Sequence, residues 1–131
     1  MIGLDTNVLV RYLAQDDPVQ SPRATALIEQ GLTEAEPGYL GVVTMAETAW
    51  VLERAYGLAD AEIAAAIERT LQAGTLVVES EQEVFTAMIA VRERRGAFAD
   101  ALIAALAAKA GCPHTLTFDR KAQRLPGYEP L

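Results

Sequence analysis

The sequence predicts one α/β domain, a three-layer α/β/α sandwich whose short parallel sheet holds four to five strands. Short apolar segments without polar alternation recur along the chain, and segments with helical spacing of apolar residues separate them. Such strands are typical of parallel sheets with helices on both faces. The length of 131 residues, 51% of them hydrophobic, fits a single domain with its own core, residues 1–131.

The order of elements follows from periodicity and from residues that end helices. Strands are expected at 2–4, 39–43, 75–78 and 114–118. Helices are expected before the Asp-Asp-Pro break at 16–18, from Ser21 or from nearer Pro18 to about 31 or 32, and over 44–57, 60–74, about 84–95, 100–110 and 119–125, before a C-terminal tail. Ser21 before Pro22 is typical of a helix start, and Thr44 with Glu47 has the form of a capping box.

Composition excludes several kinds of site. The net charge of −7 is the reverse of a simple cationic nucleic-acid clamp. Cys112 and His114 are the only residues of their types, so an internal disulfide and any site of several thiolates or imidazoles are excluded. The first residues lack the pattern of a secretory signal, and no apolar run is long enough to span a membrane. We therefore expect a cytoplasmic protein without membrane contact.

Four carboxylates occupy special places in this plan. Asp5 and Asp119 follow predicted strands, while Glu47 and Asp100 lie in the first turns of predicted helices. Carboxyl ends of parallel strands and the helix starts after them share one sheet edge, where ligands bind. Clustered carboxylates repel one another unless a divalent cation lies between them. Oxygen-only ligands favour Mg²⁺ or Mn²⁺, which suit phosphodiester hydrolysis.

Each carboxylate also has a structural interpretation. Glu47 could complete the capping box, Asp100 could be stabilised by its helix dipole, and Asp119 could cap the last helix. Asp5 is the hardest to explain structurally, because an aspartate ending an apolar strand is expected to be at least half buried without a partner. The hypothesis of a site rests on all four lying at one edge.

Basic residues concentrate late in the chain. Residues 1–91 carry 4 basic and 14 acidic groups, whereas residues 92–124 carry 7 basic and 3 acidic groups. Arg120 and Lys121 directly follow Asp119 and are candidate contacts to an RNA backbone. For the group from Arg92 to Arg95, an ordinary solvated helix end is the favoured interpretation.

The motifs around these acids resemble those of PIN-domain nucleases, in particular VapC-type toxins of toxin-antitoxin pairs. They are Asp5-Thr6-Asn7, Thr-Met-Ala-Glu ending at Glu47, Phe-Ala-Asp ending at Asp100, and Thr117-Phe118-Asp119. The resemblance spans nearly the whole chain. Many relatives carry a further acid just before the Phe-Ala-Asp segment, where this chain has Arg95-Gly96-Ala97.

The resemblance implies a Mg²⁺- or Mn²⁺-dependent endoribonuclease with Asp5, Glu47, Asp100 and Asp119 as catalytic metal ligands. Thr6 and Asn7 would orient Asp5 or a bound water, and Thr117 would support the site. The resemblance also implies a homodimer and a cognate antitoxin protein. The chain would then bind DNA only indirectly, through the antitoxin. The apolar groove for the antitoxin has Tyr12, Leu13, Trp50 and Leu52 as candidates, although these residues equally fit the core.

Three other functions share part of this residue pattern. A PIN nuclease that processes RNA without an antitoxin has the same residues. A phosphoacceptor receiver module has a similar size and clustered acids, but it needs a lysine after a late strand, where this chain has Asp119. A phosphatase of the haloacid-dehalogenase type needs an aspartate two residues after Asp5, where this chain has Asn7.

Overall fold

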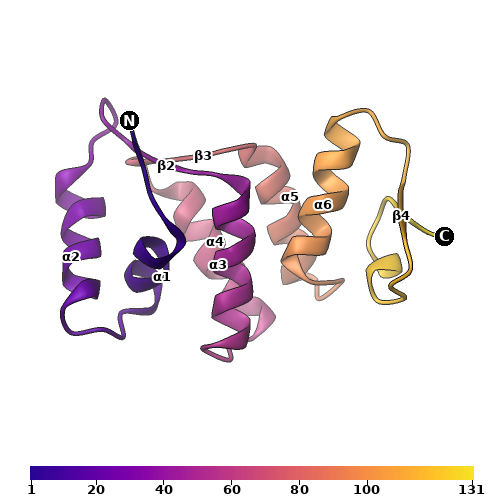
Figure 1. Ribbon diagram of the computed structural model, residues 1–131, viewed down its shortest axis with the longest axis horizontal. Helices are drawn as coiled ribbons and strands as arrows, with labels where there is room; N and C mark the ends of the chain where they lie inside the picture. The colour runs from indigo at the N-terminus through magenta and orange to yellow at the C-terminus, as the bar shows by residue number, and fades with distance from the viewer.

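The computed structural model describes residues 1–131, in which strands and helices alternate along the chain (Figure 1). The α-helices are α1 (Thr6–Ala14), α2 (Gln20–Ala26), α3 (Val42–Arg54), α4 (Asp60–Gln72), α5 (Glu81–Arg92) and α6 (Phe98–Lys109). A π-helical turn η1 (Leu27–Gly31) continues α2, and a 3-10 turn η2 (Ala122–Arg124) lies near the C-terminus. The strands are β1 (Ile2–Gly3), β2 (Gly38–Leu40), β3 (Leu76–Val78), β4 (Thr115–Thr117) and β5 (Tyr128–Pro130).

All strand pairs are parallel, and the five strands form two sheets. The first has the order β1-β2-β3, with Ile2 opposite Gly38 and Gly38 opposite Leu76. The second pairs β4 with β5. The predicted α/β class with short parallel strands is confirmed, and the arrangement is consistent with the three-layer sandwich. Both β1 and β4 have a neighbour on one side only.

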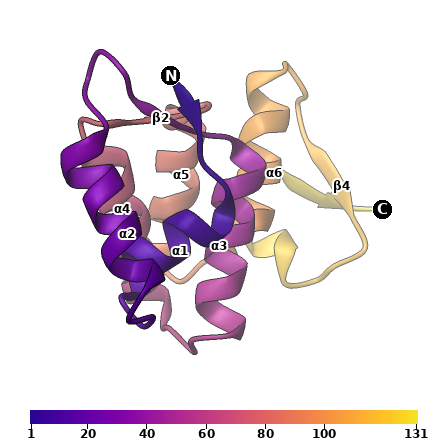
Figure 2. The same cartoon turned by 60° about the vertical axis from the view of Figure 1, so that its left-hand side comes forward.

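The core is one cluster of 22 buried residues to which α1 and α3 to α6 all contribute. Leu9, Leu40, Val84 and Met88 have no measurable exposure within it. Figure 2 shows the helices gathered around this centre, with the last part of the chain on the outer side of α6. Helix packing, more than the short sheet, therefore holds the domain together.

The junction of β2 and α3 differs from the prediction. The strand ends at Leu40, Gly41 is the N-cap, and α3 begins at Val42, so Thr44 lies inside the helix and the predicted capping box is wrong. The Val42 N–H instead donates to Glu79 Oε1 at 2.8 Å. A side chain from the end of β3 satisfies the helix start, which removes the structural interpretation of Glu47.

Residues 110–131, here called the C-terminal arm, lie beyond α6. The predicted strand at 114–118 is present as β4, but the predicted helix at 119–125 is only the turn η2, and the tail forms the additional strand β5. Only Ala122 and Leu125 of this arm are buried. Leu116 and Phe118 are 52% and 82% exposed. The arm is therefore fixed to the domain mainly through η2.

No helix of the structure is long and apolar enough to cross a bilayer.

One buried hydroxyl generates a stability prediction. Thr48 Oγ1 lies in the core, 1% of the residue is exposed, and the hydroxyl has no hydrogen-bond partner. Thr48→Val should raise the free energy of unfolding by about 1 kcal/mol. The Thr48 hydroxyl loses its hydrogen bonds to water on folding and gains none in the protein, and valine removes this cost. Thr70→Val is the matched control, since the Thr70 hydroxyl donates to the Ala66 carbonyl at 2.9 Å. Urea unfolding of both variants checks this, and equal shifts would contradict it.

Candidate functional site

The first pair of predicted ligands, Asp5 and Glu47, is joined through Thr6. Asp5 is the N-cap of α1, and its Oδ1 accepts a hydrogen bond from the Thr6 N–H at 2.8 Å. The hydroxyl of Thr6 donates to Glu47 Oε1 on α3. Thr6 itself is 8% exposed, whereas the Asp5 and Glu47 side chains on either side of it are exposed. One threonine thereby holds two carboxylates that are 42 residues apart in the sequence (47 − 5).

The environment of Asp5 differs from the expectation. Asp5 is exposed rather than half buried, and it has a structural task as the cap of α1. Asn7 lies on α1 beside Arg11 and Arg23, in a shallow hollow between α1 and α2, and makes no hydrogen bond with Asp5 or Glu47. Thr6, not Asn7, is the residue that positions the pair.

The second pair, Asp100 and Asp119, lies where α6 meets the C-terminal arm. Asp100 is the third residue of α6 and is partly buried. Burial, followed by the negative charge of Asp119, raises the pKa of Asp100 above its ordinary value. Asp119 follows β4, its N–H donates to Thr117 Oγ1 at 3.0 Å, and its Oδ1 accepts from the Lys121 N–H at 2.8 Å. Thr117 therefore supports the turn that carries Asp119.

Tyr128 and Leu125 hold the arm beside the start of α6. The Tyr128 hydroxyl donates to the Asp100 carbonyl at 2.7 Å, and burial, together with Asp100 and Asp119, raises the pKa of this phenol. Leu125 packs on Gly96, where an added Cβ would lie only 2.7 Å from Leu125 Cδ1. The absence of a side chain at Gly96 thus allows the arm to approach α6.

The second pair shares a polar hollow of 240 Å³ with four cations. It is lined by Glu53, Asp60, Arg94, Arg95, Gly96, Ala97, Asp100, Asp119, Lys121 and Arg124. None of the four cations forms an ion pair with a carboxylate, so they are available to a negatively charged ligand. Lys121 was among the predicted RNA contacts, whereas Arg120 does not line the hollow.

Arg94 and Arg95 were missed as site residues, because a charge run after a helix usually forms a solvated surface. Gly96, which follows them in the sequence, is the feature that could have indicated close packing at this point. A glycine between a helix end and the next helix start permits a close approach, and here Leu125 of the arm packs against Gly96, beside the hollow that both arginines line.

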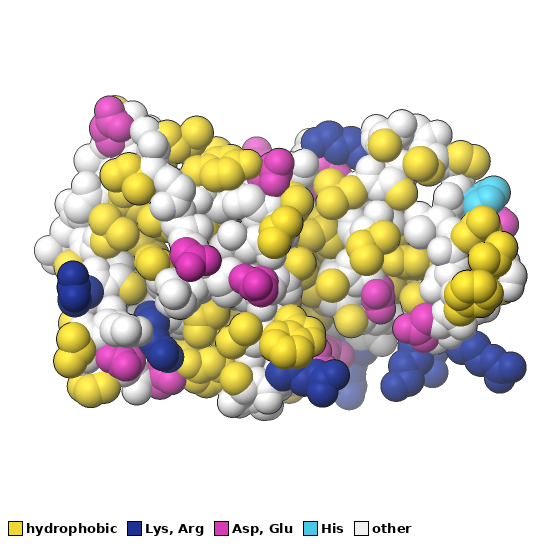
Figure 3. Space-filling view, viewed as in Figure 1, with side chains coloured by type: hydrophobic (Ala, Val, Ile, Leu, Met, Phe, Trp, Pro, Cys, Tyr) yellow, Lys and Arg dark blue, Asp and Glu magenta, His cyan; other side chains and the backbone are white.

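The two pairs do not merge into one cluster. No group of three or more acidic, histidine or cysteine side chains is placed to hold one metal ion. Figure 3 shows the acidic side chains spaced across this face, with apolar groups between them. Helices α3 and α6 are packed together, and a narrow apolar hollow lined by Ala46, Trp50 and Phe98 lies between them. The predicted four-carboxylate cluster remains a prediction.

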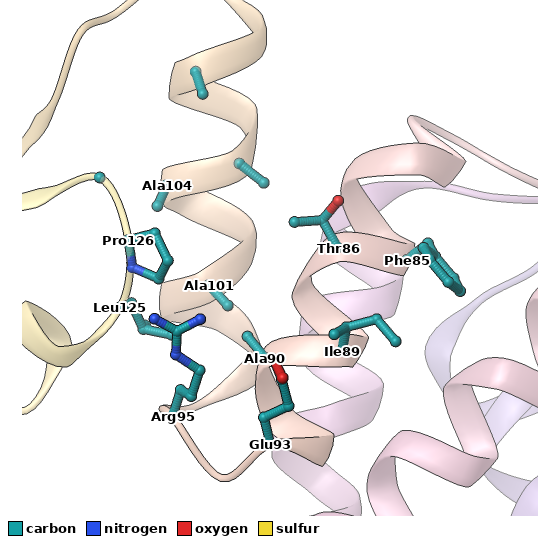
Figure 4. A pocket seen from close by; sticks show the side chains of 13 residues that line it. Phe85, Thr86, Ile89, Ala90, Glu93, Arg95, Ala101, Ala104, Leu125 and Pro126 are labelled. Atoms are coloured by element: carbon teal, nitrogen blue, oxygen red, sulfur yellow. The ribbon is translucent and has the colours of Figure 1, made fainter.

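An apolar hollow of 530 Å³ lies between α5 and α6, with Leu125 and Pro126 at its edge (Figure 4). It contains none of the four acids. Among the candidates for the antitoxin groove, Trp50 is 57% exposed. Leu52 is 1% exposed and belongs to the core, so Leu52 was a wrong candidate for the groove. Tyr12 and Leu13 pack against the core and are partly accessible.

The comparison with known families decides the relationship. The family model of the PIN domain matches residues 2–128. The chain belongs to the PIN-domain family. No curated protein and no solved structure matches it. PIN domains are generally nucleases, so membership indicates a hydrolase acting on nucleic acid and sets the receiver-like alternative aside.

The raised pKa of Asp100 predicts a pH-dependent effect of its charge on stability. Ionised Asp100 is unfavourable in the folded PIN domain, because it is partly buried and faces Asp119. Asp100→Asn should therefore raise the melting temperature at pH 7 in metal-free buffer. The gain should fade as the pH falls through the raised pKa towards the ordinary aspartate value of about 4, since Asp100 is then neutral in both states.

Asp60→Asn is the control for this measurement. Asp60 lines the same hollow but lies in the first turn of α4, where a negative charge is favourable. It should not stabilise the protein at pH 7. A lower melting temperature for Asp100→Asn at pH 7 would contradict the prediction.

Proposed function

We propose that this PIN domain is a Mg²⁺- or Mn²⁺-dependent endoribonuclease, with Asp5, Glu47, Asp100 and Asp119 as its catalytic residues. The family match carries the nuclease part of the proposal. The observation that favours these four residues is that two carboxylate pairs lie beside the strand ends without a lysine or arginine ion pair.

A divalent cation fits this donor set. All four groups offer hard oxygen ligands. Burial, followed by the negative charge of Asp119, raises the pKa of Asp100, and a cation between the two carboxylates would relieve the repulsion. The four carboxylates would hold the ion, which when bound would polarise a phosphoryl oxygen and activate water. Each pair alone supplies only part of such a site.

The chain's own residues would bind and orient the substrate. Arg94, Arg95, Lys121 and Arg124 face the hollow of Asp100 and Asp119 and would contact the phosphates of the RNA. Thr6 would keep Asp5 and Glu47 in a fixed relation during the reaction. Arg120, outside the hollow, would contact RNA only further along the strand.

The nuclease proposal predicts metal-dependent cleavage. Asp5→Asn should lower RNA cleavage by about 100-fold or more. Mutation of a residue that only supports a metal ligand can already cost about 100-fold in activity, so mutation of a ligand itself should cost at least as much. Asparagine caps helices as well as aspartate, so the melting temperature should stay close to that of the wild type. The measurement is cleavage of a structured RNA with Mg²⁺, with Mn²⁺ and with EDTA.

Asp16→Asn is the matched control, because Asp16 is exposed and interacts with Arg11 and Tyr56, away from both pairs. It should cleave RNA at the wild-type rate. Full activity in EDTA would refute the metal-dependent mechanism.

We further propose that the enzyme is the toxin of a type II toxin-antitoxin pair, acts on cytoplasmic RNA, and forms a homodimer. The motif resemblance to VapC-type toxins supports this part. The cognate antitoxin would cover the exposed face near Trp50, with Tyr12 and Leu13 as further candidates, and would provide the only link to DNA.

The toxin proposal predicts growth arrest. Expression of the wild-type chain alone should stop growth of the host cells, whereas Asp5→Asn, produced at the same level, should not. Colony counts and immunoblots measure both. Normal growth with soluble, RNA-cleaving wild-type protein would favour the alternative of an RNA-processing nuclease without an antitoxin.

A further inference from the structure

The exposed side of α3 carries an acid, an aromatic ring and a cation in one row. Glu47, Trp50 and Arg54 are spaced by three and four residues, so they follow one another along the same face of the helix. All three are exposed, and Trp50, the only tryptophan of the chain, is 57% exposed. The ring therefore lies within one helical turn of a proposed catalytic carboxylate.

A narrow apolar hollow extends from Trp50 to the start of α6. It reaches Ala99, the residue before Asp100. Glu53 and Asp60 line both this hollow and the polar hollow of the second pair of acids, so the two hollows adjoin. The ring of Trp50 is therefore close to acids on α3 and on α6.

The face of the Trp50 ring is only loosely covered. The guanidinium carbon of Arg54 lies 5.8 Å from the ring centroid. This separation is near the outer limit of a cation–π contact, which is about 6 Å. Arg54 forms no ion pair with a carboxylate, so its guanidinium is free to bind another group.

A ligand of Trp50 has to lie on the ring. The apolar hollow beside Trp50 has a volume of 40 Å³, close to the share of one water molecule in the liquid, about 30 Å³. A nucleobase or a large apolar side chain is too big to enter it. A flat group can stack on the exposed ring instead.

The charges near Trp50 fit a base better than a phosphate. Glu53 and Asp60 repel phosphates, but their oxygens accept hydrogen bonds from the amino and imino groups at the edge of a base. Four cations without ion pairs line the adjoining polar hollow: Arg94, Arg95, Lys121 and Arg124. A nucleotide can therefore place its base on Trp50 and its phosphate towards these cations.

We propose that Trp50 stacks with an unpaired base of the RNA substrate, next to the phosphate that is cleaved. The proposal rests on the proposed nuclease function and names its substrate class: single-stranded RNA, or an unpaired loop of a structured RNA. A base inside a duplex is already stacked on its neighbours and cannot reach the ring. Arg54 covers the other face of the base, because guanidinium planes also stack on bases.

The emission of the single tryptophan reports this contact directly. A short unstructured RNA is titrated into the full chain in EDTA and, with Mg²⁺, into Asp5→Asn, so that the RNA is not cleaved. The single strand should quench the emission of Trp50, whereas the same strand annealed into a duplex should bind without quenching. Equal quenching by the duplex, or binding of the single strand without quenching, would overturn the proposal.

Substitution of the ring tests the stacking energy. Trp50→Leu should weaken binding of the single strand by about 5- to 150-fold, the range expected for one lost stacked base, and Trp50→Phe should retain most of the affinity. The dependence of affinity on salt should not change, because no phosphate contact is lost. Lys121→Gln should instead lower that slope by about 1. Fluorescence anisotropy of a labelled RNA measures both quantities.

Phe85→Leu is the matched control. Phe85 is also an exposed aromatic residue, at 50%, but it lies on α5 at the apolar hollow of Figure 4, which contains none of the four acids. It should bind RNA as the wild type does, and the melting temperatures of the variants should stay close to that of the wild type. Unchanged RNA affinity of folded Trp50→Leu would overturn the proposal and favour a protein partner for the ring.

The stacking and the nuclease function fail separately. A wild type that cleaves RNA while single-stranded RNA leaves its tryptophan emission unchanged would refute the stacking and leave the nuclease proposal standing. Quenching by the single strand, with weaker binding by Trp50→Leu but no cleavage in Mg²⁺ or Mn²⁺, would support the contact with the base and refute the nuclease.

Discussion

Repulsion between carboxylates is the constraint around which this molecule is arranged. Acids beside parallel strand ends would normally be neutralised by lysine or arginine, yet neither pair here has such an ion pair. Burial, followed by the negative charge of Asp119, raises the pKa of Asp100. Carboxylates with a perturbed pKa and no ion pair are typical of functional sites. The arrangement is consistent with the nuclease chemistry of PIN domains.

Four cations lie near Asp100 and Asp119 without forming ion pairs with them. Arg94, Arg95, Lys121 and Arg124 line the hollow of Asp100 and Asp119 but leave the carboxylates unpaired. An acidic protein can thereby present local positive charge beside carboxylates that stay unpaired. The net charge of −7 alone would have hidden this capacity.

Much of the fold follows from local patterns, and the differences follow from distant contacts. The apolar strands and the helices around the core were predictable, as were the positions of Asp5 and Asp100 near strand and helix ends. The true start of α3 was not, because its cap is Glu79, far along the chain. The bond from Thr6 to Glu47 has no local signature either. Strand β5 was not predicted, because Gly127 before it and Pro130 within it favour an irregular tail. The division into two sheets depends on which strands pair, and no single segment of sequence shows this.

The close packing at Gly96 affects the geometry of the acids near the C-terminal arm. The missing side chain of this glycine sets the spacing between the start of α6 and the arm, and with it the spacing of two acids that are not its neighbours in sequence. A single methyl group at this position would press on Leu125 and displace the arm, which would change the distance between Asp100 and Asp119 without replacing either acid. The spacing of two acids thus depends on a residue that has neither charge nor side chain.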